Sequence, residues 1–263
     1  MIEAKSESFW KFIDRDAKID RTATGFKFTE GPVFSRRGYL LFSDIPNQRI
    51  HKWERGQLAV FRENSNRANG LTFDHQGRLL TCEGGGRVTR TEKNGSITVL
   101  ASEGLQGPND LVYAIDGHIY FTDLPKSRVY QITRKGDVKV VADDCQGPNG
   151  VALSPNQQKL YVADGRGKKT RIYDIAPDGS LRPGRDFAPI GGDGLKTDEA
   201  GNVWIASGGA LEVFSAQGEP LGSVKPPEAP SNLCWGAGFR GLYITARTSV
   251  YHVETRVNGT RTY

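Results

Sequence analysis

NDLVYAIDGHIYFTD, residues 109–123, and NGVALSPNQQKLYVAD, residues 149–164, are two copies of a pattern that recurs along the chain. Each copy has a polar residue, a short β-type run, a turn rich in Gly, Asp or Asn, and a second run rich in β-branched and aromatic residues. Copies begin at Glu30, Asn69, Asn109, Asn149, Asp193 and Asn232, at intervals of 39, 40, 40, 44 and 39 residues. A period near forty with paired strands in each unit is typical of a β-propeller.

The repeat units cover 25–62, 66–100, 105–142, 146–188, 191–224 and 230–254, and most offer two further strands joined by Gly-containing turns. We therefore predict an all-β, six-bladed propeller with four-stranded blades around a central metal-binding tunnel, as a single domain over residues 1–263. The last unit is short, so Lys18–Thr24 is expected to pair with it as the outer strand and close the ring. Residues 3–16 are expected to form a short helix anchored by apolar side chains such as Phe9 and Ile13.

Composition limits the possible partners. The 263 residues carry a net charge of +5, but the basic residues are dispersed and no Lys/Arg block contains aromatics, so a nucleic-acid partner is not expected. No apolar run approaches the length of about 18 residues that a membrane span needs, and the N-terminus lacks the apolar core of a secretory signal. Cys82, Cys145 and Cys234 form no CxxC pair, so we expect buried free thiols in a cytoplasmic protein. Nothing in the sequence indicates a particular oligomeric state.

The polar residues that open the six units are expected to form a ring, because equivalent residues on the first strands of a propeller point at the same axis. Two are carboxylates and four are carboxamides, and oxygen-only ligands favour Ca²⁺ or Mg²⁺ over zinc or copper. A single Asn or Asp before Gly often only bonds to turn backbone. Six in register, with acids in two positions, favour a cation site instead.

Further acids flank this ring. Asp44, Glu83, Asp123 and Asp164 end the second strands of four units, and we expect them to accept hydrogen bonds from the turn that follows. Asp110 stands next to Asn109 and is expected to hold a metal ligand in place without binding the ion itself.

Taken together, these motifs resemble the gluconolactonase family, which includes regucalcin (the senescence marker protein) and is related to diisopropyl fluorophosphatase. The residues that carry the resemblance include EGPVF at 30–34, RANGLTFDHQGRLLTCE at 67–83, GPNDLVYAIDGHIYFTD at 107–123, GPNGVALSPNQQKLYVAD at 147–164 and DGLKTDEAGNVWIAS at 193–207. The resemblance implies one divalent cation in the tunnel, usually Ca²⁺, with Mg²⁺, Mn²⁺ or Zn²⁺ as alternatives. The metal ligands that it implies are Glu30, Asn109, Asn149 and Asp193.

By the same resemblance, Asp193 would also be the catalytic residue, as base or nucleophile, and Asn109 would bind either metal or substrate. Periodicity adds Asn69 and Asn232 as predicted substrate contacts, and Arg247 is predicted to bind an anionic substrate. The implied function is metal-dependent opening of a small-molecule lactone, such as a sugar lactone. Alternatives are phosphotriester hydrolysis with the same cation, another ester substrate, or a non-catalytic calcium-pinned propeller that binds ligands through its rim.

Overall fold

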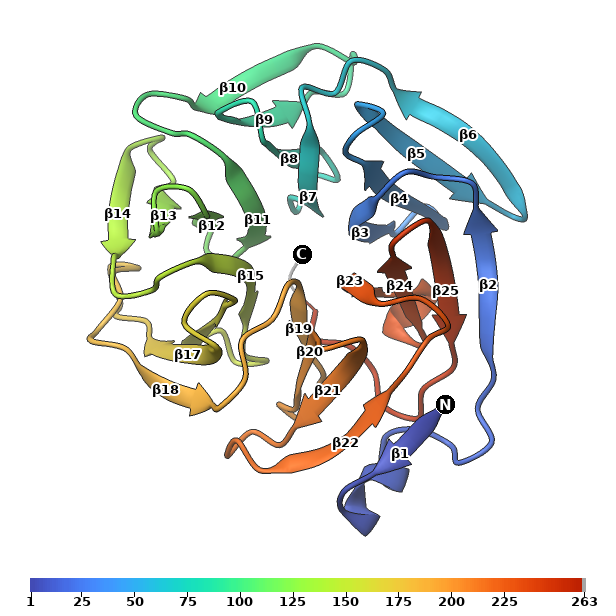
Figure 1. The fold of residues 1–263 in the computed structure, drawn as a ribbon. Coiled ribbons are helices and arrows are strands. Elements are labelled where there is room, and N and C mark those ends of the chain that lie inside the picture. The colour runs from blue at the N-terminus through green and yellow to red at the C-terminus, as the bar shows by residue number, and fades with distance from the viewer. Residues whose placement is uncertain (262–263) are drawn as a thin grey trace.

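The computed structural model describes residues 1–261 and arranges six antiparallel sheets as a ring (Figure 1). In each sheet the first strand of a repeat unit lies innermost, and the following strands succeed it outward in sequence order. The sheets are the blades of a six-bladed β-propeller, which confirms the fold predicted from the period.

The bounds of the strands follow the repeat. Blade one contains β3 (Thr29–Ser35), β4 (Tyr39–Asp44), β5 (Arg49–Glu54) and β6 (Gln57–Arg62), and blade two contains β7 (Ala68–Phe73), β8 (Leu79–Glu83), β9 (Arg87–Thr91) and β10 (Ile97–Ala101). Blade three contains β11 (Pro108–Tyr113), β12 (Ile119–Asp123), β13 (Arg128–Ile132) and β14 (Val138–Ala142), and blade four contains β15 (Pro148–Leu153), β16 (Lys159–Asp164), β17 (Lys169–Asp174) and β18 (Arg185–Ala188). Blade five contains β19 (Leu195–Thr197), β20 (Val203–Ser207), β21 (Ala210–Phe214) and β22 (Pro220–Val224), and blade six contains β23 (Pro230–Trp235), β24 (Leu242–Ala246) and β25 (Ser249–Val253).

Burial explains why the second strand of each unit reads as an almost continuous apolar run. Every residue of β12 is buried, because its two faces pack on the neighbouring blades, whereas most residues of the outer strand β14 are exposed. The core is divided accordingly into apolar clusters between adjacent blades, such as the one that joins Leu80 of blade two to Phe121 of blade three. This packing holds the inner strands in fixed positions around the axis.

The N-terminal segment completes two blades. β2 (Ile19–Thr24) pairs antiparallel with β25 as the outer strand of blade six, which confirms the closure predicted for Lys18–Thr24. β1 (Ile2–Ala4) pairs with β22 and gives blade five a fifth strand, which was not predicted. The expected helix over residues 3–16 is only a 3₁₀ helix, η1 (Glu7–Lys11). Phe9 of this helix and Ile13 after it are fully buried between blades five and six.

A second 3₁₀ helix, η2 (Ala237–Phe239), lies between β23 and β24. Cys82, Cys145 and Cys234 are free and buried, as predicted. Among residues 1–261, no helix combines the length and the apolar character needed to cross a membrane.

Candidate active site

The ring residues stand at β-bulges. In blades one to four, the inner strand loses its register with the second strand just after the ring residue, for example between Glu30 and Val33 in β3. β23 has its irregularity between Pro230 and Asn232, and Asp193 lies two residues before β19. A bulge bends the strand and redirects a side chain, so these irregularities set the direction of the ring residues.

Glycine after the ring residue lets neighbouring inner strands approach closely. A Cβ on Gly70 would stand 2.6 Å from the Cα of Asp110 in the next blade, and one on Gly150 would stand 2.5 Å from the carbonyl oxygen of Asp193. Real Cβ contacts of this kind do not occur, so any larger residue would widen the ring. The repeated Asn-Gly and Asp-Gly pairs therefore hold the ring residues of successive blades together.

Two carboxyl groups and a carboxamide of the predicted set lie together at the mouth of the tunnel. Glu30 is 3 % exposed and accepts hydrogen bonds from the backbone N–H of Gly31 and from Nδ2 of Asn232, the latter at 3.0 Å. Asp193 shares side-chain hydrogen bonds with Asn149 and Glu30. Residues of blades one, four and five, far apart in the sequence, are thus in mutual contact.

Burial and mutual repulsion make these acids unusually basic. Burial raises the pKa of Glu30 well above its ordinary value, and the charges of Asp193 and Asp110 raise it further. Burial also raises the pKa of Asp193 to about 6, although its hydrogen bond with Asn149 acts in the opposite direction. The carboxyl groups therefore lack enough positive charge around them when no cation is bound.

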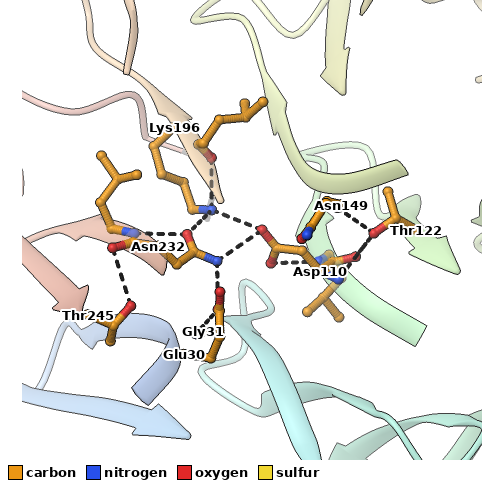
Figure 2. A network of polar contacts seen from close by, with 11 residues as sticks. Glu30, Gly31, Asp110, Thr122, Asn149, Lys196, Asn232 and Thr245 are labelled. Atoms are coloured by element: carbon orange, nitrogen blue, oxygen red, sulfur yellow. Dashed lines mark hydrogen bonds and ion pairs between the residues drawn. The ribbon is translucent and has the colours of Figure 1, made fainter. Parts of the chain in front are cut away.

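Asp110 and Asn232 form the floor of this group of acids (Figure 2). Asn232 is 2 % exposed, and its Nδ2 lies 3.4 Å from Oδ2 of Asp110 in addition to its bond with Glu30. The second carboxylate oxygen of Asp110 accepts a hydrogen bond of 2.9 Å from the N–H of Leu111. Asp110 thus contacts Asn232, which contacts Glu30, and the supporting role expected for Asp110 stays a prediction.

The two remaining predicted carboxamides, Asn69 and Asn109, lie on the inner strands β7 and β11. Oδ1 of Asn69 is buried and has no hydrogen-bond partner in residues 1–261. The carbonyl oxygen of Asn109 lies beside Gly70 of blade two, as its place in the ring requires. The substrate contacts predicted for Asn69, Asn109 and Asn232 stay predictions.

Arg247 lies on the rim, exposed, in the turn between β24 and β25. Its positive charge lowers the pKa of Asp193, so its field reaches the carboxyl cluster. A substrate contact by Arg247 stays a prediction.

One polar residue of the tunnel was not predicted as part of the site. Lys196 of β19 points its ammonium at Oδ2 of Asp110, 3.4 Å away, and at Oδ1 of Asn232, 3.5 Å away (Figure 2). Beyond it the tunnel continues as a cavity of about 70 Å³ whose lining includes Val33, Leu71 and Leu153. An alignment of the units contains the signal, because three residues after the ring position the chain has Val33, Thr72, Val112, Ala152, Lys196 and Trp235, of which Lys196 alone is charged.

Asp44, Asp123 and Asp164 accept hydrogen bonds from the turns that follow them, as predicted. Glu83 instead forms ion pairs with Arg62 and Arg87. Asp123 accepts hydrogen bonds from the N–H groups of Gln106 and Gly107, at 2.8 and 3.1 Å, and Asp164 does the same for the loop that precedes β15. These bonds fix the loops that lead into the inner strands and so position the ring residues.

The donor set fits a hard divalent cation. No group of three or more His, Cys, Asp or Glu side chains suited to a metal occurs in residues 1–261, so a metal would need the carboxamides as ligands. Glu30 is buried and Asp193 is half-buried, and the pKa values of both are raised. Oδ1 of Asn69 is a further oxygen without a hydrogen-bond partner in residues 1–261. Oxygens of this kind suit Ca²⁺ or Mg²⁺.

Known proteins share this architecture and much of the sequence pattern. The family model of the SMP-30/Gluconolactonase/LRE-like region matches residues 28–248. A gluconolactonase of Zymomonas mobilis is 27 % identical over 298 residues, which cover 94 % of this chain and 84 % of the relative. The solved structure of a gluconolactonase from Xanthomonas campestris has 28 % identity and a TM-score of 0.90, covering 97 % of this chain and 94 % of that one.

A more distant likeness concerns the fold alone. Regucalcin of Agrobacterium tumefaciens, described as a calcium-binding protein, has 17 % identity and a TM-score of 0.81, covering 93 % of this chain and 95 % of that one.

Proposed function

Because the chain belongs to the SMP-30/Gluconolactonase/LRE-like family, we propose that it is a lactonase, which opens a lactone by adding water at the tunnel mouth. The observation that carries the proposal is the meeting of Glu30 and Asp193, two carboxyl groups with raised pKa values, on a ring of carboxamides. Strongly shifted acids in a concave site are characteristic of catalytic groups. The gluconolactonases of Zymomonas and Xanthomonas support a lactone as the substrate class.

Asp193 is the proposed catalytic residue. In the metal-free protein burial raises its pKa to about 6, but a bound cation would lower that pKa again, so proximity to the water and orientation must supply much of its effect as a base. As a base it takes a proton from water while the water oxygen adds to the lactone carbonyl carbon, and the ring oxygen receives a proton as the C–O bond breaks. As a nucleophile it would instead attack the carbonyl carbon directly and form an acyl intermediate that water then cleaves.

The neighbours of Asp193 orient the reaction. Asn149 hydrogen-bonds to the carboxylate, which fixes its direction, and Asp110 keeps it basic through its negative charge. Oδ1 of Asn69 has no hydrogen-bond partner in residues 1–261, which supports a role as acceptor of a hydrogen bond from a hydroxyl group of the substrate. Arg247 on the rim would attract an anionic substituent.

A divalent cation, with Ca²⁺ as our first choice, would be held by Glu30, Asn109, Asn149 and Asp193. When bound, it would supply Lewis-acid polarisation of the lactone carbonyl. The description of regucalcin as calcium-binding supports this choice of ion.

The test is a matrix of substrates and metal. Protein stripped with a chelator is assayed with gluconolactone, an aromatic ester and paraoxon, with and without added Ca²⁺, beside the Asp193→Asn variant. We expect calcium-dependent opening of the lactone and its loss in the variant. Turnover of paraoxon alone would replace the lactonase by a phosphotriesterase, and inertness to every substrate would favour a binding module. Undiminished turnover in the variant would remove Asp193 from its catalytic role.

A further inference from the structure

Lys196 brings a positive charge into contact with Asp110 and Asn232, beside the carboxyl cluster. Its side chain is only 24 % exposed, and its ammonium donates to the carbonyl oxygen of Leu195 at 2.9 Å. It also reaches Asp110 of blade three and Asn232 of blade six, at 3.4 and 3.5 Å. Its ammonium thus contacts side chains of blades three and six and the backbone of its own blade five (Figure 2).

The charges at the mouth balance if one divalent cation is added. Glu30, Asp193 and Asp110 contribute three negative charges when ionised, and Lys196 is paired with Asp110. Two uncompensated negative charges then remain, on Glu30 and Asp193. Buried charges are tolerated only when they are paired, so this cluster matches an ion of charge +2.

Lys196 also fixes the orientation of the Asn232 amide. Oδ1 of Asn232 accepts from the Leu233 N–H at 2.8 Å and faces the ammonium, and this turns Nδ2 toward Glu30. The lysine thus acts on Glu30 twice, through the charge it neutralises on Asp110 and through the amide it orients.

We propose that Lys196 is the residue that sets the charge of the ion that the ring prefers, favouring a divalent over a trivalent cation. The inference rests on the cation of the proposed function. It does not depend on which substrate is opened. Neither Lys196 nor Asp110 is one of the four proposed ligands, so both can be changed without removing a ligand.

The test compares La³⁺ with Ca²⁺, ions of similar radius, by calorimetric titration of the metal-free protein at pH 7. Lys196→Met leaves three negative charges and is expected to raise the ratio of La³⁺ to Ca²⁺ affinity about tenfold or more. Asp110→Asn leaves the lysine unpaired and is expected to lower the ratio by a similar factor. The double variant restores the original balance and is expected to return the ratio to within about threefold of the starting protein.

Matched controls separate charge from structure. Lys196→Arg keeps the positive charge and is expected to keep the ratio of La³⁺ to Ca²⁺ affinity. Lys159→Met removes a lysine from an ion pair with Asp174 in blade four, where the two groups are 2.6 Å apart. It is expected to leave the same ratio unchanged. If the two single variants shift the ratio in the same direction, or the double variant fails to restore it, the inference is overturned. If the unmodified protein binds neither ion, the cation of the proposed function is what fails, and the inference fails with it. Lactone turnover does not enter this measurement.

Discussion

Replacing Asp193 by asparagine is expected to stabilise the metal-free protein at pH 7, even though it removes the proposed catalytic group. The folded protein raises the pKa of Asp193 from 3.8 to about 6. At about 1.4 kcal/mol per pKa unit, ionised Asp193 costs the fold about 3 kcal/mol at pH 7. Asparagine is neutral and retains a partner in Asn149, so we expect a gain of about 1–3 kcal/mol, because Glu30 relaxes the cost by sharing a proton.

The sign depends on pH in a defined way. Between pH 4 and 6 the folded state holds a proton on Asp193 that the unfolded state has already lost, so the stability of the wild-type protein falls as pH rises through this window. The asparagine variant lacks this loss. The difference in free energy of unfolding between the two proteins is therefore expected to be small near pH 4. It is expected to grow between pH 4 and 6 and to reach its full value by pH 7.

Thermal and urea unfolding of the chelator-treated proteins measure the effect. For a chain of this size the gain corresponds to a rise in Tm of about 3–8 °C at pH 7. Asp174→Asn is a matched control of opposite sign, because the hydrogen bond from Lys159 lowers the pKa of this exposed carboxyl. The reasoning is refuted if metal-free Asp193→Asn is no more stable than wild type at pH 7, or if its advantage is the same at pH 4.

Three further outcomes are expected. Ca²⁺ at a hundred times its Kd is expected to stabilise the wild-type protein by about 2.7 kcal/mol in thermal unfolding. The Glu30→Gln variant is expected to gain less. If Ca²⁺ stabilises both proteins equally, Glu30 is not a ligand. Arg247→Ala removes a charge that lowers the pKa of Asp193, so the acidic limb of the kcat/KM profile for lactone opening is expected to move to higher pH, and an unmoved limb would contradict it. Phe9→Ala empties a fully buried position between two blades and is expected to cost about 3–5 kcal/mol in urea unfolding, against less than about 0.5 kcal/mol for the exposed Glu7→Ala.

The ring of six blades and its closure could be predicted from the sequence alone, because the signals that indicate them are periodic. The polar residues that begin each unit stand one repeat apart, and identical positions in identical blades must face the same axis. Contact between Glu30 and Asp193 followed from that symmetry, although 163 positions separate them in the chain. The pairing of residues 19–24 with the last blade was predictable from the number of strands, because the last unit has one strand fewer than the others.

Features that break the symmetry were harder to predict. β1 is only three residues long and has no apolar alternation, so its pairing with β22 depends on the sheet edge that it meets and has no signal of its own. The helix expected over residues 3–16 is only the 3₁₀ helix η1. The conformation of this segment depends on the burial of Phe9 and Ile13 between two blades, which helical periodicity does not predict. Lys196 was passed over for a similar reason, since its role appears only when Asp110 and Asn232 are seen in contact with it.

The pairing of β2 with β25 has a consequence for how the protein is made. β2 is translated before β3–β24, whereas its partner β25 is translated after them. Until translation has passed Val253, the nascent chain must carry an unpartnered strand edge and an incomplete circle of blades. Asn232, which holds Glu30, also belongs to the late-synthesised blade. Glu30 and Asn232 can therefore meet only after translation has reached blade six, although Glu30 is made with blade one.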